Sequence, residues 1–264
     1  MNITRFRGLS ALPLFRVLKA KVRGLRLVTF NALVLGLVAY PVSAGVRVQP
    51  MSYDLVPSGQ KTKQDLRVEN TGSTPTAVEV RVERREVMPD GTDKRTPAED
   101  DFLVFPPQGI VPANGFQTFR IQYIGDPAIN QTKLYLITIA QLPVSATGQA
   151  GTGIQIVYNV GTLAAVTPLG AAAKIEIASV TAAPEPGQIE ITVRNAGNRY
   201  ARLRSGSWTL TSGDGKAEVL EGEPLRNAID NSLIDAGGTR VIRLPVSANF
   251  RLQGASASFK LSSD

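Results

Sequence analysis

Three short patterns in the sequence could carry chemistry, and none has the setting that its chemistry needs. Ser58-Gly59-Gln60-Lys61 has the Ser-x-x-Lys spacing of a serine nucleophile activated by lysine. That chemistry needs one helical turn to bring the amine back to the hydroxyl, whereas the neighbouring Pro57 and Gly59 predict a tight turn. Gly151-Thr152-Gly153 lacks the helix that follows a phosphate-binding loop. Asn130-Gln131-Thr132 spells a glycosylation sequon, and nothing in the chain shows that its host uses it.

An acidic cluster between residues 90 and 101 has side chains of the type that binds calcium. Its spacing fits no calcium-binding loop, and a solvated hairpin between strands is the simpler interpretation. The chain has no cysteine and no histidine, which excludes disulfides, thiolate and imidazole metal ligands, and every cysteine or Ser-His nucleophile. We therefore expect no enzyme, no metal and no cofactor. The function is expected to be binding.

The net charge is concentrated outside the predicted folded body. The chain carries 29 Lys and Arg against 22 Asp and Glu, a formal net charge of +7. Seven of the basic residues lie in residues 1–44, which contain no acid, so residues 45–264 carry 22 charges of each sign. A nucleic-acid-binding domain needs a basic surface of its own. We therefore expect no nucleic-acid partner.

Residues 1–44 are typical of an export signal. A basic start is followed by an apolar run over residues 27–40, and Val42-Ser43-Ala44 places small residues at the −3 and −1 positions of a cleavage site. The apolar run is shorter than the roughly 20 residues of a transmembrane helix. We expect cleavage after Ala44 and an exported protein without membrane contact. An uncleaved N-terminal anchor is the alternative, because the basic region is long.

Beyond Ala44, apolar and polar residues alternate with the period of two that a half-buried strand shows. The clearest runs are residues 66–70, 77–83, 119–123 and 189–193. Turns rich in Gly, Pro, Asn and Asp separate these runs. No stretch of 12 residues after the signal has a helical period. The sequence therefore predicts an all-β protein of the sandwich type.

Two sequence matches at nearly the same offset indicate an internal duplication. Residues 68–72 recur 125 positions later, and residues 111–121 recur 123 positions later. Two copies predict two sandwiches built on one plan rather than a solenoid. Pro168 and Gly170 then end a β-rich run. We expect a signal peptide over 1–44, an N-terminal domain over 45–168 and a C-terminal domain over 169–264.

Residues 154–166 form the stretch that an ordinary core explains least. On one side of the extended chain lie four large apolar side chains: Ile154, Ile156, Tyr158 and Val160. Exposed strand edges are usually protected by charge or proline, yet between residues 127 and 173 the only charge is Lys133. One interpretation is an ordinary final strand of a sandwich. The other is an edge strand that binds another chain, or a second copy of this one, by β-strand addition.

The order and spacing of further motifs resemble the periplasmic pilus-assembly chaperones of the PapD-like family. The matching stretches, in chain order, are residues 55–59, 66–72, 105–107, 111–120, 134–143 and 195–201. They span nearly all of residues 46–264, and the second domain matches more weakly. The resemblance implies two immunoglobulin-like β-sandwich domains in a boomerang arrangement, preceded by a signal peptide.

The resemblance also implies partners. In this family the last strand of the first domain completes the open groove of an exported fimbrial subunit, and the chaperone then docks on an outer-membrane usher. By that comparison, the subunit-binding side chains are Ile154, Ile156, Tyr158 and Val160. Pro106 and Pro107 match a surface used for the usher, with a rigid turn between strands as the alternative. Arg120 matches a structural position of the network between the two domains.

Two features of the family are missing here. The family usually holds the subunit's C-terminal carboxylate with an Arg on the first strand and a Lys on the donor strand, but the matching positions are Tyr53 or Asp54 and Leu163. In the network between the domains, Thr132 and Thr167 stand where the family has Glu and Arg. We therefore expect strand donation without the family's anchor. We also expect apolar contact, rather than strong polar pairing, between the domains.

Two functions are consistent with these observations. The first is a chaperone that stabilises pilus or fimbrial subunits and delivers them to an usher. The second is an exported structural or adhesion protein that assembles through its own edge strands. A complex that forms only when a subunit is coexpressed favours the first.

Overall fold

The computed structural model describes residues 45–143 and 157–262. The predictions for the export signal and for Ile154 and Ile156 fall outside these residues. Strands dominate the described part, which holds one α-helix, α2 (Gly222–Ala228). None of its helices is long and apolar enough to cross a membrane. The predicted all-β class is confirmed.

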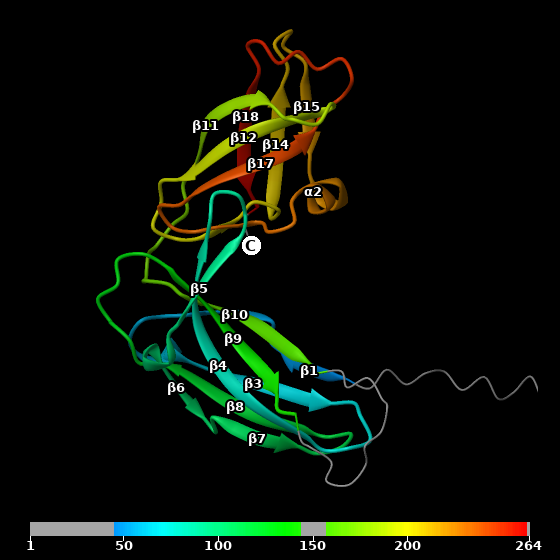
Figure 1. The fold of residues 1–264 in the computed structure, drawn as a ribbon. Helices are drawn as coiled ribbons and strands as arrows, with labels where there is room; N and C mark the ends of the chain where they lie inside the picture. The colour runs from blue at the N-terminus through cyan, green and yellow to red at the C-terminus, as the bar shows by residue number, and fades with distance from the viewer. Residues whose placement is uncertain (1–44, 144–156, 263–264) are drawn as a thin grey trace, which may run out of the picture. The chain divides into compact units, whose positions relative to one another are not determined.

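The first sandwich consists of two sheets built from residues 46–166 (Figure 1). One sheet has the strand order β1 (Val46–Gln49), β3 (Lys63–Asn70), β8 (Phe116–Tyr123), β6 (Phe102–Phe105). The other has the order β2 (Ser52–Leu55), β10 (Asn159–Val166), β9 (Lys133–Gln141), β4 (Thr76–Val87), β5 (Asp93–Pro97), with β7 (Gln108–Val111) also paired to β4. Side chains of both sheets share one core, so the sheets pack face to face.

Alternation in the sequence explains this packing. β3 and β8 pair antiparallel and bury alternate residues in the same phase. Leu66 and Val68 of β3 and Phe119 and Ile121 of β8 are completely buried, whereas the residues between them face outward. The four predicted period-two runs all lie in strands, so those predictions are confirmed.

The first strand changes sheets half-way along. β1 pairs antiparallel with β3 in one sheet. After Pro50 and Met51 the chain continues as β2, which pairs parallel with β10 in the other sheet. The short β2 therefore covers only part of one edge of β10.

The second sandwich is built from residues 175–261 and has its own core. Its sheets are β11 (Ile175–Ala182), β12 (Gln188–Asn195) and β17 (Thr239–Pro245), then β15 (Ala217–Leu220), β14 (Gly206–Thr211) and β18 (Ser256–Leu261), with the short pair β13 (Ala201–Arg202) and β16 (Leu233–Ile234). Trp208 is fully buried in this core. Its indole N–H donates to the carbonyl of Leu203 at 3.0 Å, so burial leaves no unpaired donor on the ring.

A buried asparagine ties one corner of the first sandwich together. The Nδ2 of Asn70 donates to the carbonyls of Thr74 (2.7 Å) and Val111 (3.3 Å). Its Oδ1 accepts from the N–H of Gly72 (2.9 Å). One side chain thus satisfies three main-chain groups of a turn and of the strand that faces it.

The second sandwich repeats this corner with Asn195. Its Nδ2 donates to the carbonyls of Arg199 (2.7 Å) and Asp235 (3.0 Å), and its Oδ1 accepts from the N–H groups of Gly197 and Lys174 (3.1 Å each). The two matching sequence segments therefore form the same corner twice, as two sandwiches built on one plan would. The domain boundary at residues 168 and 169 stays a prediction.

Polar contacts join the two sandwiches. Asp54 of β2 accepts hydrogen bonds from the guanidinium of Arg199 (2.8 Å) and the hydroxyl of Tyr200 (3.2 Å). An apolar cluster that includes Leu163 and Leu233 also draws on both. The expected apolar contact is confirmed, but the expected lack of polar pairing is wrong. Thr132, at a position of the family's network, also contacts the second sandwich, because its N–H donates to the carbonyl of Asn198 at 2.9 Å.

Candidate partner-binding edge

The candidate site is one edge of β10. Along its whole length β10 pairs antiparallel with β9. On its other side β2 begins only opposite Leu163. Within the described residues, positions 159–162 therefore have no strand on that side. We call residues 159–162 the open edge.

Main-chain groups of the open edge are directed away from β9. The N–H of Leu163 donates to the carbonyl of Met51 at 2.9 Å, toward β2. Because alternate residues of a strand direct their amide groups to the same side, Asn159 and Gly161 direct theirs to the open side. These groups are available to an added strand.

Side chains on the core face of β10 leave the core gradually. Val166, Ala164 and Thr162 are completely buried. Val160 is partly buried against the first core, and Tyr158 is 37% exposed. Since alternate residues share one face, this row extends the apolar surface of the core beyond the sandwich itself.

The main chain of Tyr158 is held to β9. Its carbonyl accepts from the N–H of Gln141 (2.9 Å), and its own N–H donates to the Oε1 of Gln141 (3.1 Å). Ile154 and Ile156 lie outside the described residues, so their place in the row stays a prediction. The two interpretations of this segment apply to different halves. Residues 163–166 are paired on both sides like an ordinary strand, whereas the open edge is paired on one side.

No cation occupies the positions that match the family's anchor. Tyr53 is half-buried, and its hydroxyl oxygen lies 3.4 Å from that of Thr162. Burial raises the pKa of the Tyr53 hydroxyl to about 12. Asp54 is engaged by Arg199, and Leu163 is buried in the apolar cluster. The departure that the sequence indicated is therefore present in the structure.

A different cation, which sequence reasoning missed, lies where the open edge ends. The Nη2 of Arg202 in β13 donates to the Oγ of Ser52 at 2.8 Å. With Arg204, Arg202 lines a cavity of about 620 Å³ that also includes Met51 and Leu163. Among the described ion pairs neither arginine has a carboxylate partner. Their alternation with buried residues was visible in the sequence, but the contact with Ser52, 150 positions away, was not.

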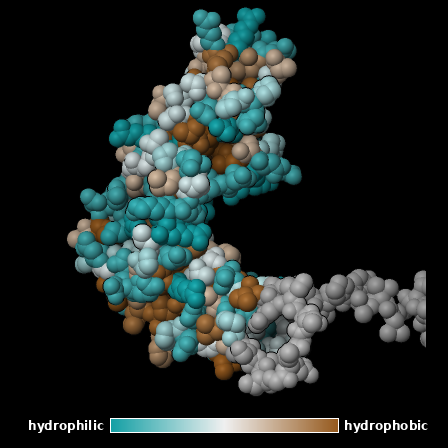
Figure 2. Space-filling view, in the orientation of Figure 1, coloured by the Kyte–Doolittle hydropathy of each residue, from teal (hydrophilic) through white to brown (hydrophobic). Residues whose placement is uncertain are grey.

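Pro106 and Pro107 lie between β6 and β7 on a surface with exposed apolar side chains. Phe105 is 72% exposed and Ile110 is 67% exposed. Figure 2 shows hydrophobic atoms at the surface over this part of the first sandwich. A rigid turn alone does not require an exposed phenylalanine, whereas grouped exposed apolar side chains are typical of interaction surfaces.

Arg120 makes its described contacts within the first sandwich. Its Nε and Nη2 donate to the carboxylate of Asp65 at 2.8 and 3.0 Å on an exposed face. This hydrogen-bonded guanidinium lowers the pKa of Asp65. The buried hydroxyl oxygens of Thr132 and Thr167 lie 3.2 Å apart, so a neutral hydrogen bond stands where the family has an ion pair.

The other chemical patterns have structural roles in the described part. Ser58 and Lys61 are exposed around the short 3₁₀ turn η1 (Gln60–Thr62). Asp93 of the acidic hairpin pairs with Arg85 at 2.9 Å. Among the described residues, no group of three or more His, Cys, Asp or Glu side chains could hold a metal ion.

A family model for the N-terminal domain of PapD, a pili and flagellar-assembly chaperone, matches residues 48–162. This range holds the paired sheets of the first sandwich and ends within the open edge. The first sandwich therefore belongs to the family of PapD-like N-terminal domains. No curated protein matches it.

Solved structures of PapD-like proteins share the fold at low sequence identity. The class 5 fimbriae chaperone CfaA is 13% identical (TM-score 0.51), with 83% of this chain and 100% of that chain covered. The SafB chaperone of Salmonella enterica, solved with the SafA pilin, is 17% identical (TM-score 0.52), with 83% of this chain and 96% of that chain covered. A chain of the CsuC–CsuE chaperone–subunit complex of Acinetobacter baumannii is 15% identical (TM-score 0.51), with 78% of this chain and 90% of that chain covered. These likenesses show the fold of two β-sandwiches.

Proposed function

We propose that this PapD-like protein is a periplasmic chaperone that stabilises exported pilus or fimbrial subunits by donating β10 to them. The observation that carries the proposal is the open edge, whose apolar row leaves its own core between Val160 and Tyr158. Proteins of the same fold have been solved with a pilin and with an adhesion subunit, which supports this class of partner.

We expect apolar side chains to supply most of the free energy of binding. We assign this role to the predicted row: Ile154, Ile156, Tyr158 and Val160. Burying one fully exposed side chain of this kind contributes about 1.5–3 kcal/mol, so about 6–12 kcal/mol is the upper limit for the four before ordering costs, because Val160 and Tyr158 are already partly buried in the free protein. Hydrogen bonds from Asn159 and Gly161 add direction and register, because a strand pairs only in extended form.

The surface at Pro106 and Pro107 is proposed to contact the outer-membrane usher. β7 pairs with β4, and β9 separates β4 from β10. The proline surface and the open edge therefore lie at different strands of one sheet. An usher can then dock at the proline surface while a subunit still occupies β10.

Coexpression with a candidate fimbrial subunit tests the proposed function. The expected result is a soluble one-to-one complex, together with loss of the subunit to aggregation or proteolysis when the chaperone is omitted. A protein that forms the same oligomers with and without the subunit would instead support a structural protein that assembles through its own edges.

Export is expected to remove residues 1–44. The N–H of Gly45 donates to the Oγ1 of Thr71 at 3.0 Å, so the new N-terminus would begin next to β1. The intact mass of periplasmic material is expected to match residues 45–264. A full-length protein retained in the inner membrane would show an anchor instead.

Arg202 is proposed to hold the C-terminal carboxylate of the bound subunit. A strand added to the open edge must end near Met51, where β2 takes over that side of β10. Three arginines (Arg85, Arg202 and Arg204) and two carboxylates (Asp93 and Asp230) line the cavity at this end, and the excess of positive charge favours a carboxylate over an ammonium group.

The Arg202→Gln variant is expected to bind the subunit about tenfold more weakly, a loss between those of exposed and buried ion pairs. Arg251→Gln removes an exposed guanidinium elsewhere in the second sandwich and serves as the matched control. A subunit with an amidated C-terminus is expected to bind both Arg202→Gln and the parent at the weaker level. If amidation weakens subunit binding by Arg202→Gln as much as binding by the parent, another group holds the carboxylate.

A further inference from the structure

The turn between β4 and β5, residues 89–92, contacts the second sandwich, and we call it the hairpin tip. The N–H of Val241 in β17 donates to the carbonyl of Pro89 at 2.8 Å. The Nδ2 of Asn231 donates to the carbonyl of Gly91 at 2.9 Å. Two main-chain carbonyls of the first sandwich are thus satisfied by the second.

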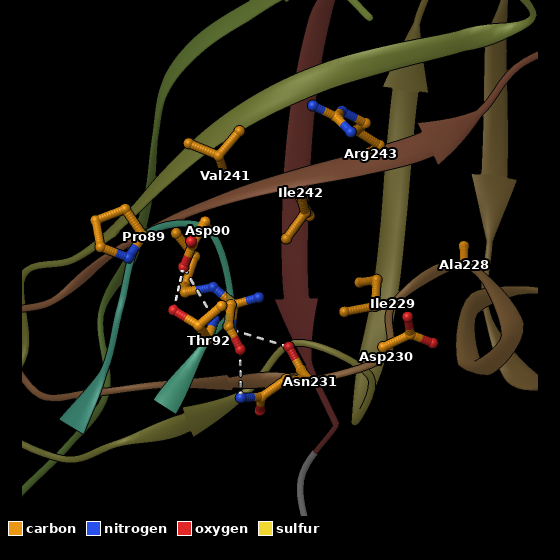
Figure 3. A pocket seen from close by; sticks show the side chains of 12 residues that line it. Pro89, Asp90, Thr92, Ala228, Ile229, Asp230, Asn231, Val241, Ile242 and Arg243 are labelled. Carbon is orange, nitrogen blue, oxygen red and sulfur yellow. Dashed lines mark hydrogen bonds between the residues drawn. The ribbon is translucent and has the colours of Figure 1, made fainter. Parts of the chain in front are cut away.

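The hairpin tip covers an otherwise open strand edge. β17 pairs with β12 on one side, and the N–H of Val241 reaches the tip from the other. Figure 3 shows the tip beside Val241 and Asn231, next to a cavity of about 710 Å³ that also borders the end of α2. The hydrogen bonds to Val241 and Asn231 hold the tip at this position.

A buried cation lies beneath the tip. Arg240 is 4% exposed, and its Nη1 donates to the carbonyls of Asn231 (2.9 Å) and Leu233 (2.5 Å). Burial lowers the pKa of Arg240, and the nearby carboxylates of Asp90 and Asp93, both in the β4–β5 hairpin, oppose that shift. A buried guanidinium needs such partners, so the hairpin contributes to the site that holds this cation.

At Gly91 the hairpin tip lies directly against the side chain of Arg240. Its φ is 93°, in the region that favours glycine, and a Cβ at this position would lie 2.6 Å from the Nη2 of Arg240. Asn231 donates a second hydrogen bond from the same Nδ2 to the Oδ1 of Asp93 (3.1 Å). The hairpin base is held as well, because the N–H of Val87 donates to the Oδ2 of Asp235 (3.0 Å).

We propose that the hairpin tip is a latch that positions the second sandwich relative to β10. β4 pairs with β9, and β9 pairs with β10, so the tip and the open edge belong to one continuous sheet. The second sandwich carries Arg202. A docked tip therefore contributes, together with the contact between Arg202 and Ser52, to where this cation stands relative to the end of the open edge. Only this last consequence rests on the proposed function.

Distances between the sandwiches in the free protein test the latch. The chain has no cysteine, so Lys61→Cys and Glu185→Cys place one spin label on each sandwich at exposed positions. Pulsed electron paramagnetic resonance is expected to give one narrow distance for the parent. Gly91→Ala and Asn231→Ala are expected to lose it in favour of a broad distribution, with circular dichroism unchanged.

Gly187→Ala is the matched control, because Gly187 also has a positive φ (77°) but no atom lies within 4 Å of its added Cβ. It is expected to keep the narrow distance. Narrow distances in both Gly91→Ala and Asn231→Ala would overturn the latch. If Gly91→Ala does not fold, Asn231→Ala decides alone. Since no subunit is present, the result is independent of whether the proposed function holds.

Discussion

The Tyr158→Asp variant is expected to remain folded but to lose its subunit. Tyr158 is 37% exposed at the point where the apolar row leaves the first core, so a carboxylate there stays hydrated in the free protein. In the complex it would be buried in an apolar groove without a paired cation, which costs several kcal/mol. We expect affinity to fall by at least about 100-fold, measured by calorimetry or by yield on coexpression.

Asn159→Asp is the matched control for this experiment. It adds the same charge one residue along, on the opposite face of β10, and Asn159 is exposed. We expect Asn159→Asp to bind nearly as the parent does, and Ile156→Asp to behave as Tyr158→Asp does. Copurification of Tyr158→Asp at full yield would end the donor-strand assignment. A fall in its melting temperature without a subunit would place the side chain in its own core.

The Asn195→Ala variant is expected to lose about 3–5 kcal/mol of stability. Asn195 is completely buried and makes four hydrogen bonds to main-chain groups. Each bond contributes about 1 kcal/mol, and the groups left unpaired in the interior add a desolvation penalty. Urea denaturation followed by Trp208 fluorescence reports on this sandwich, because that is the only tryptophan in the chain.

Asn227→Ala, at an exposed position of α2, is the control and is expected to change stability by less than about 0.5 kcal/mol. Asn70→Ala removes the equivalent side chain of the first sandwich, with three hydrogen bonds, and is expected to destabilise that sandwich. If Asn195→Ala unfolds at the same urea concentration as Asn227→Ala, the corner would not be a main source of stability.

Local patterns in the sequence were sufficient to predict the architecture. The alternation in residues 66–70 and 119–123 specified which faces of β3 and β8 are buried, because side chains of a strand alternate strictly. The repeated asparagine predicted a shared plan, since a buried corner needs the same polar side chain each time. The absence of charge around residues 154–166 indicated an unprotected edge.

The remaining features depend on which distant segments become neighbours. That β2 begins only opposite Leu163 and leaves residues 159–162 open follows from where the first strand changes sheets. The contact of Arg202 with Ser52 and of the hairpin tip with Asn231 joins residues about 140 to 150 positions apart. Periodicity reports only the face on which a residue lies. Tertiary packing alone decides which face of another sandwich it meets.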